Sequence, residues 1–325
     1  MKIDIQKHVG NKELYYVGEL TSKIIQGMQL DGEVYLWSKE GKNSEQNGLY
    51  QLLDELCGFW KWDKKNITID TTNLFNVHDC YNIVYTYYSH PAEYFNVDSA
   101  TTTWNGSMYY GMFIGRATAS RIYALHKHHN FKFKHKGLTS FHTELFNFMS
   151  LPELVDYFFY SNQTYKEMLS IPTPYSDIDE IKVPPITPLD DVLDWSTVYE
   201  KIAIEVVCET STEPNCYEIS EKILRPMYYK RPFLLIGSPK NLTALHKVGF
   251  KTFNHLFDES YDQLGESNFA RVNRVFKILQ YLVEEYGLEK LLQDANDILE
   301  HNHYMVIEYH KHHKNFNYVK YINDK

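Results

Sequence analysis

The chain has 325 residues, of which 43% are hydrophobic and 23% are charged, and its formal net charge is −9 with histidine neutral. This apolar content suffices for one large or two medium cores and excludes a disordered chain. The acidic balance disfavours non-specific nucleic-acid binding as the main activity, because phosphate neutralisation requires clustered Lys and Arg. No segment approaches the roughly 18 consecutive apolar residues of a membrane helix, and no signal peptide is evident. We therefore expect a cytoplasmic protein with no membrane partner.

Cysteine spacing indicates neither a disulfide framework nor structural zinc. The four cysteines, Cys57, Cys80, Cys208 and Cys216, form no CxxC pair and no Cys/His zinc pattern. Basic residues gather in two places, 126–136 and 310–314, where lysines are interleaved with histidines. These clusters fit either solvated helix ends and loops or a surface for an anionic acceptor.

The first third of the chain predicts alternating strands and helices. Residues 31–37 alternate in polarity and are rich in β formers, and the apolar run 49–56 that follows a polar loop has the character of a helix. Further strands are expected at 67–71 and 81–87. We assign residues 1–105 to an N-terminal α/β domain on the acceptor side.

A second β-loop-α unit begins with the apolar strand 108–114 and the helix after it. The next strand is expected within 131–134 and 140–141, followed by a helix over 143–159. Five prolines in 172–188 predict an extended surface excursion, since proline interrupts helices and central strands.

The clearest alternation of strands and helices lies in the last 125 residues. Apolar strands are expected at 202–208 and 233–236, and helices at 220–230, 242–248, 270–286 and 288–309. Such alternation implies parallel strands with right-handed crossovers, and ligands bind at the carboxyl ends of those strands. We assign 106–300 to a ligand-binding α/β domain, and 301–325 to a C-terminal helix and tail that return to the first domain.

The segment from Glu209 to Arg225 carries the chemistry that a nucleoside diphosphate requires. Glu209 ends an apolar strand, and after a loop Ser220 caps a helix that opens with Glu221 and Lys222. A carboxylate can accept hydrogen bonds from both ribose hydroxyls. Helix N–H groups, Lys222 and Arg225 can neutralise the diphosphate, including the charge that develops as it leaves.

This order of residues resembles the nucleotide-sugar signature of the α1,3-fucosyltransferases, in which a Glu-Asn-Ser loop precedes Thr-Glu-Lys and an Arg three residues on. The sequel, from Arg231-Pro232-Phe233 to Asp262, resembles glycosyltransferase-like proteins carried by bacteriophages. The likeness implies a GT-B fold, in which two Rossmann-like domains face a cleft and residues 106–300 bind the nucleotide sugar. A phage origin would place the protein in the host cytoplasm.

The resemblance also implies a role for each matching residue. Glu209 would bind the ribose, and Lys222 and Arg225 the diphosphate. The family begins its donor domain with a strand, a Ser-containing loop and an Arg at the next helix, which adds Arg116 and Arg121 to the site.

The chain departs from the family pattern at three places. Thr210-Ser211 replaces Asn-Ser, Ser220 replaces Thr, and Pro226 follows the arginine. The nucleotide therefore stays open between UDP and GDP.

Ordinary structural roles are the alternative for these residues. Glu221 and Lys222 fit a solvated first turn of a helix, Glu209 a backbone cap, and Arg116 or Arg121 a simple ion pair.

An inverting transfer needs a base, which we expect from the first domain. Glu40, in the loop after the first predicted strand, is the candidate, with Glu33, Asp79 and His78 as rivals. Aromatic side chains could stack on an acceptor ring or belong to the core: Tyr15, Tyr16, Tyr35, Trp37 and Trp104.

No metal or other cofactor is predicted. Asp177-Ile178-Asp179 has the letters of a metal-binding Asp-x-Asp, but it lies in the proline-rich excursion without a preceding apolar strand. A solvated acidic loop accounts for it better.

The leading hypothesis is therefore a metal-independent glycosyltransferase that moves a sugar from a nucleotide-diphosphate donor to a hydroxyl. The acceptor is a glycan or a hydroxymethylated or glycosylated DNA base. The alternatives are a catalytically silent nucleotide-binding module with a GT-B-like fold, and a structural virion protein.

Overall fold

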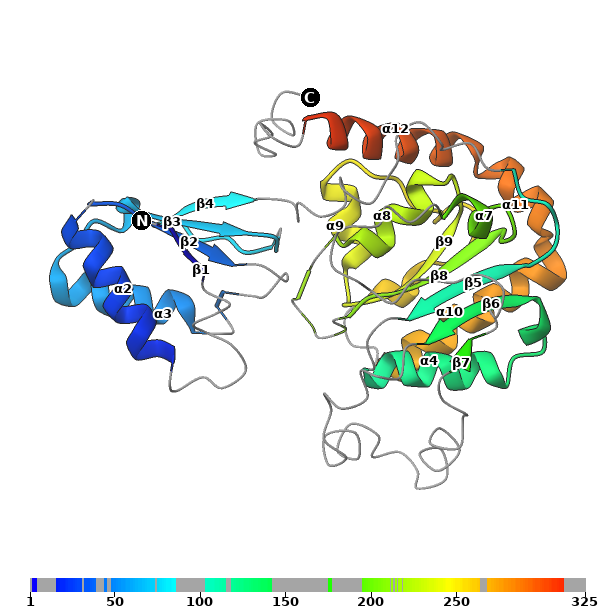
Figure 1. The fold of residues 1–325 in the computed structure, drawn as a ribbon, viewed down its shortest axis with the longest axis horizontal. Helices are drawn as coiled ribbons and strands as arrows, with labels where there is room; N and C mark the ends of the chain where they lie inside the picture. The colour runs from blue at the N-terminus through cyan, green and yellow to red at the C-terminus, as the bar shows by residue number, and fades with distance from the viewer. Residues whose placement is uncertain are drawn as a thin grey trace, which may run out of the picture. The chain divides into compact units, whose positions relative to one another are not determined.

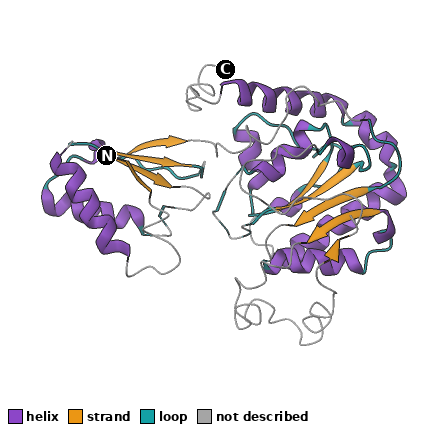
Figure 2. Ribbon diagram, viewed as in Figure 1, coloured by secondary structure: helices purple, strands orange, loops and turns teal. Residues whose placement is uncertain are grey.

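The computed structural model describes residues 2–4, 16–30, 32–38, 44–45, 48–73, 75–85, 103–114, 118–141, 175–176, 195–210, 212, 214, 216–217, 219–263 and 268–312. The chain forms two compact units. One is Met1–Ser89 with Pro214–Ile219 and His312–Lys325, and the other is His90–Glu213 with Ser220–Lys311. Each contains a mainly parallel sheet with helices (Figure 2), which confirms the α/β class. None of the described helices is long and apolar enough to cross a membrane.

The first unit contains a four-stranded parallel sheet in the order β1-β2-β3-β4. Its elements are β1 (Lys2–Asp4), α2 (Tyr16–Leu30), β2 (Val34–Ser38), α3 (Leu49–Trp60), η1 (Lys64–Asn66), β3 (Ile67–Thr71) and β4 (Asn82–Tyr85). Because the strand order follows the chain, right-handed crossovers put α2 and α3 on the same face of the sheet (Figure 1). The core between this face and the helices includes Leu20, Ile24, Leu36, Leu53, Ile67 and Ile69.

The second unit contains a five-stranded sheet in the order β7-β6-β5-β8-β9, in which only β7 is antiparallel to its neighbour. Its elements are β5 (Tyr110–Ile114), α4 (Ala119–His129), η3 (Lys134–Lys136), β6 (Gly137–Phe141), β7 (Tyr175–Ser176), α7 (Ser196–Tyr199), β8 (Ile204–Cys208), α8 (Glu221–Tyr228), β9 (Phe233–Ile236), α9 (Asn241–Lys247), η5 (Ser260–Asp262), α10 (Asn268–Tyr281), the π-helical η6 (Leu282–Tyr286), α11 (Leu288–Asp294) and α12 (Asn296–His312). Strands β5, β8 and β9 are buried along their whole length, which explains their unbroken apolar runs.

Strand order reverses between β5 and β8. The chain passes from β5 through α4 to β6, and then returns to β8 on the other side of β5. Helices α4 and α10 consequently lie on one face, and α8 on the other (Figure 1). Ligands of open α/β sheets bind outside the carboxyl ends of the strands at such a reversal. The carboxyl ends of β5 and β8 are therefore where a site is expected.

One predicted strand is wrong in position. Residues 131–134 form a tight turn that continues into η3, and β6 begins only at Gly137. The turn is needed because the chain must reverse after α4: Lys134 N donates to Phe131 O, and Lys136 N to Phe133 O. Within the excursion 172–188 the structure describes only β7, an edge strand, and the helix predicted at 143–159 lies outside the described residues.

The C-terminal helix packs on the second unit for most of its length. Helix α12 belongs to the second unit up to Lys311, and Asn302 exchanges hydrogen bonds with the backbone of Lys251, while the residues from His312 onward are grouped with the first unit. His303 Nδ1 also lies 2.6 Å from Tyr228 O. The second unit likewise takes in residues before 106, because Trp104 Nε1 donates to the carbonyl oxygens of Met108 and Lys201.

Candidate functional site

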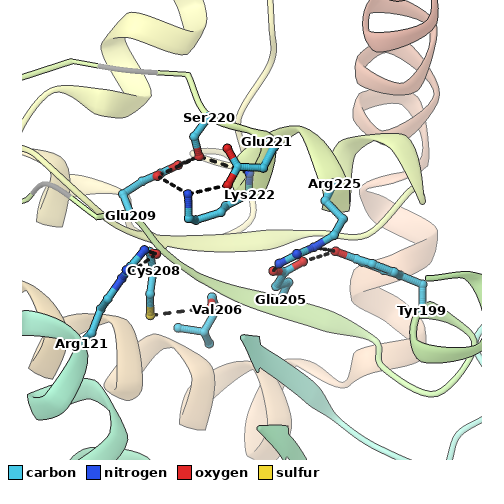
Figure 3. Close-up of polar contacts among 10 residues, drawn as sticks. All are labelled: Arg121, Tyr199, Glu205, Val206, Cys208, Glu209, Ser220, Glu221, Lys222 and Arg225. Carbon is cyan, nitrogen blue, oxygen red and sulfur yellow. Dashed lines mark hydrogen bonds and ion pairs between the residues drawn. The ribbon is translucent and has the colours of Figure 1, made fainter. Parts of the chain in front are cut away.

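Glu209 lies at the carboxyl end of β8, directly at the reversal of strand order. Its side chain is only 7% exposed. The hydroxyl of Ser220 lies 2.7 and 2.8 Å from the two carboxylate oxygens and donates to them, and the same oxygen accepts a hydrogen bond from Lys222 N as the N-cap of α8. One serine thus fixes both the helix start and the carboxylate (Figure 3).

Lys222 completes this cluster. Its ammonium lies 2.7 Å from Glu221 Oε1 and 4.0 Å from Glu209 Oε2, and its side chain keeps 21% of its surface exposed. The predicted group of Glu209, Ser220, Glu221 and Lys222 is therefore brought together by the β8-loop-α8 connection. We call these four residues the Glu209 cluster.

Burial governs the electrostatics of the cluster. Burial raises the pKa of Glu209 above its ordinary value, although Lys222 and the Ser220 hydroxyl act in the opposite direction. For Glu221, burial also acts to raise the pKa, but Lys222 outweighs it and holds the pKa below its ordinary value. The two carboxylates share one ammonium, so an anion that enters the cluster changes the electrostatics of all three groups, and a hydroxyl changes their hydrogen bonding.

Arg225 does not join the Glu209 cluster. Its guanidinium lies 2.7 Å from Glu205 Oε1 and donates to the Tyr199 hydroxyl at 3.0 Å, while that hydroxyl donates to Glu205 (Figure 3). Trp195 and Phe113 pack on the guanidinium, with ring centroids 4.2 and 5.3 Å from its central carbon. Arg225 is thus held inside a buried ion pair beneath the helix.

The pKa values of two members of this second group, Arg225 and Tyr199, are raised. Burial acts to lower the pKa of Arg225, but Glu205 and Tyr199 outweigh it and raise that pKa. Burial, together with Glu205, raises the pKa of Tyr199 well above its ordinary value. We call Glu205, Arg225 and Tyr199 the Glu205 lock, since each member satisfies the others.

Arg121, in the first turn of α4, contacts the end of β8, where the strand order reverses. It is 1% exposed, and its guanidinium donates to Cys208 O at 2.7 and 3.2 Å and to Thr210 Oγ1 at 3.1 Å. Its charge also acts to lower the pKa of Glu209. Arg121 therefore positions the end of β8, and Arg116, the other predicted arginine, lies outside the described residues. Burial raises the pKa of the neighbouring Cys208 thiol to about 12, so this thiol is unreactive.

Asn241, at the start of α9, is a site residue that the sequence pattern missed. It is 5% exposed, and its Oδ1 accepts no hydrogen bond from the described residues. A Cβ on Gly237 would lie 2.5 Å from Asn241 Nδ2 and 3.4 Å from the Cβ and Cγ of Glu209, so Gly237 lets both side chains approach. The available signal was its place at the start of the helix that follows the carboxyl end of β9.

The described residues among those predicted for the first unit do not form one cluster. Glu40 lies outside the described residues, Glu33 and Asp79 are exposed, and the ring of His78 packs against Tyr50 and Tyr81. A buried carboxylate that the pattern missed is Asp70 on β3, which accepts a hydrogen bond from Tyr35 at 2.5 Å.

Two of the predicted aromatic residues are hydrogen-bonded within their own units. Tyr35 donates to Asp70, Trp104 donates to backbone carbonyls, and Tyr15 lies outside the described residues. Among the described residues no group of three or more His, Cys, Asp or Glu side chains could hold a metal ion. Asp177-Ile178-Asp179 is outside this part of the chain.

Taken by its chemistry, the Glu209 cluster combines hydrogen-bond acceptors with a cationic donor at the N-terminus of an eight-residue helix. Carboxylates accept from hydroxyls, and an ammonium beside helix N–H groups attracts a phosphate. Comparison with known proteins gives no match to a family model, to a curated protein or to a solved structure. A functional assignment therefore rests on these residues and their geometry.

Proposed function

We propose that the protein transfers a sugar from a nucleoside-diphosphate sugar to a hydroxyl acceptor, with the Glu209 cluster as the donor site. The observation that carries the proposal is the position of Glu209: a buried carboxylate at a strand reversal, 4.0 Å from Lys222 and held by the N-cap of α8. In this role Glu209 accepts hydrogen bonds from the ribose hydroxyls. Asn241 Oδ1, the unsatisfied acceptor, is available to the same ligand.

The diphosphate is assigned to Lys222 and the N-terminus of α8. Helix N–H groups and an ammonium act where the leaving phosphate develops charge, and neither requires a metal ion. Arg225 contributes indirectly, because the Glu205 lock holds the first turns of α8 against β8. Arg121 contributes by positioning the end of β8.

The remaining parts of the proposal follow the resemblance described above. They are a GT-B arrangement of the two units, an inverting transfer with Glu40 as the base, and a UDP- or GDP-linked donor. The acceptor is a glycan or a modified DNA base.

A thermal-shift panel tests the donor site. Wild type is heated with UDP-, GDP-, ADP- and CMP-sugars, and a ligand at about 100 times its Kd should stabilise the fold by about 2.7 kcal/mol. Lys222→Met should abolish most of the shift, whereas Lys247→Met, an exposed lysine in the last turn of α9, should leave it unchanged. The site assignment fails if no nucleotide shifts wild type, or if both variants shift as wild type does.

The alternative function is nucleotide binding without turnover. Its motivation is that the described residues of the Glu209 cluster explain binding better than they explain catalysis. Release of nucleoside diphosphate in the presence of acceptor glycans or DNA separates the two functions. A strong thermal shift without such release, equal in wild type and Glu40→Gln, would favour the binding module.

A further inference from the structure

A basic and aromatic surface lies at the amino-terminal end of the strands of the second sheet, and the Glu209 cluster lies at their carboxyl-terminal end. Residues 131–136, Phe-Lys-Phe-Lys-His-Lys, come after the carboxyl end of α4 and directly before the first residue of β6. The amino ends of parallel strands share one edge of a sheet, and Glu209 follows the carboxyl end of β8. This surface is therefore separate from the proposed donor site, which neither uses nor explains it.

The charge of this region contrasts with the rest of the chain. The protein has 42 acidic residues among 325, yet none occurs between Asp98 and Glu144, where six Lys and Arg residues are found. Arg121 is buried, but Lys132 and Lys134 are exposed and Lys127 and Lys136 are partly exposed. The segment that forms this surface therefore contributes only positive charge of its own in an acidic protein, which favours contact with a polyanion.

Aromatic rings lie among these lysines. The Tyr109 and Phe133 rings have centroids 6.0 Å apart, and each carries an ammonium above it, Lys136 at 5.6 Å and Lys132 at 5.2 Å. Phe131 lies 5.8 Å from Phe133 and anchors it to Phe276 of α10. Tyr109, Phe131 and Phe133 are all partly exposed, so lysines and aromatic residues lie together on one surface.

The ordinary explanation accounts for part of this surface only. His126, Lys127 and His129 lie in the last turn of α4, where cations favour the helix dipole. Lys132 forms an ion pair with Glu284 at 2.5 Å. Exposed ion pairs contribute little to stability, so Lys132 can leave Glu284 at little cost and bind another anion. Neither explanation covers Lys134, or the rings beneath Lys132 and Lys136.

We propose that the surface formed by Tyr109, Phe133, Lys132, Lys134 and Lys136 binds single-stranded nucleic acid. Lysines neutralise successive phosphates, and unpaired bases stack on aromatic rings, which is the combination that binds single strands without sequence preference. A duplex keeps its bases inside the stack and would use only the lysines. This inference does not depend on the proposed sugar transfer.

Fluorescence anisotropy with a labelled oligothymidylate of about 15 nucleotides tests the surface. The variant K132Q/K134Q/K136Q removes three positive charges and keeps polar side chains, and K65Q/K247Q/K251Q changes the net charge equally at exposed lysines elsewhere. At about 50 mM salt the first variant should bind at least about ten-fold more weakly than wild type. The magnitude of its slope of log affinity against log salt concentration should fall by about two, because each of the three lost phosphate contacts contributes about 0.7 to the slope. The second variant should stay close to wild type.

A ring substitution separates stacking from charge. Phe133→Leu should weaken oligothymidylate binding by about five-fold or more without changing the salt slope. Equal loss in both lysine variants overturns the proposal, as does tighter binding of a duplex of the same length. Patch-dependent binding of vesicles containing phosphatidylserine, without oligonucleotide binding, also overturns it. None of these outcomes bears on the nucleotide-sugar panel, which probes Lys222 at the other edge.

Discussion

Glu205 belongs to β8 and Glu209 directly follows this strand. Both side chains contact α8 or its N-cap, yet their surroundings differ. Glu205 lies within β8, is 1% exposed, and is fully matched by Arg225 and Tyr199. Glu209 lies just beyond the strand, where a serine hydroxyl holds it and the nearest ammonium is 4.0 Å away. A carboxylate that is matched by a cation inside the fold serves stability, whereas one that is matched only in part can accept a ligand. The two glutamates thus differ in how fully cations match them at the two ends of α8.

The largest expected effect comes from breaking the Glu205 lock. Arg225→Met leaves a buried carboxylate without its cation, which should lower the free energy of unfolding by about 3–5 kcal/mol. Urea denaturation measures this change. The double variant E205Q/R225M removes both charges and should recover at least about 1 kcal/mol relative to R225M. A loss below about 1 kcal/mol for R225M would show that the pair does not stabilise the fold and that Arg225 is free for a ligand.

A smaller effect is expected at the shared serine of the Glu209 cluster. Ser220→Ala removes the N-cap of α8 and the hydroxyl that holds Glu209, and should lower the free energy of unfolding by about 1–3 kcal/mol. Ser220→Thr keeps both hydrogen bonds and should stay within about 0.5 kcal/mol of wild type. Ser107→Ala, on the surface, is the matched control. If threonine is as damaging as alanine, side-chain volume rather than the hydroxyl matters at this position.

The contrast between the two glutamates also shows which parts of the structure sequence patterns can predict. Strands at 67–71 and 233–236 are found where they are predicted, because continuous apolar runs flanked by turn residues have few alternatives. The Glu209 cluster was predictable for a local reason, since a capped helix that follows a strand brings its first turn to the strand's end. By contrast, β1 has three residues and is defined only by pairing with β2, a long-range contact that no local pattern encodes.

Arg225 shows where local patterns fail. Its spacing from Lys222 places both on one side of α8, and the resemblance assigns both to the diphosphate. The distinguishing signal was Glu205, an acidic residue inside an otherwise apolar strand, which must find a cation if it is buried. The structure shows that Arg225 is that cation, with Trp195 and Phe113 packed over its guanidinium.

The pH dependence of stability distinguishes Glu209 by its raised pKa. The folded chain keeps a proton on Glu209 at pH values where the unfolded chain, with a pKa near 4.5, has released it. Stability from this group is therefore present below about pH 4.5 and is lost as pH rises through the folded pKa. Glu209→Gln lacks this loss, so its stability relative to wild type should increase over that range, by at most about 1.4 kcal/mol per unit of pKa shift.

Thermal unfolding of wild type and E209Q from acid to neutral pH measures the difference. Burial also raises the pKa of Glu259 to about 7 and of Asp262 to about 6, and these groups add the same slope to both proteins. Subtraction therefore removes Glu259 and Asp262 and leaves Glu209 together with the groups it is coupled to, Glu221 and Lys222. A difference that changes in the opposite direction would mean that Lys222 dominates burial and that Glu209 is a matched ion pair like Glu205.

The smallest effect on stability is expected at Lys222. This variant tests the contrast between Glu205 and Glu209 most directly. Its ammonium contacts a partly exposed Glu221 and stands at the edge of ion-pair distance from Glu209, so Lys222→Met should change the free energy of unfolding by about 1 kcal/mol or less. The same substitution should weaken binding of a nucleoside diphosphate by at least about ten-fold, because a charged hydrogen bond contributes about 1.5–3 kcal/mol. Arg225→Met should show the reverse, a large loss of stability with ligand affinity reduced only through α8. Equal effects of the two substitutions on stability would mean that α8 does not separate a structural end from a binding end.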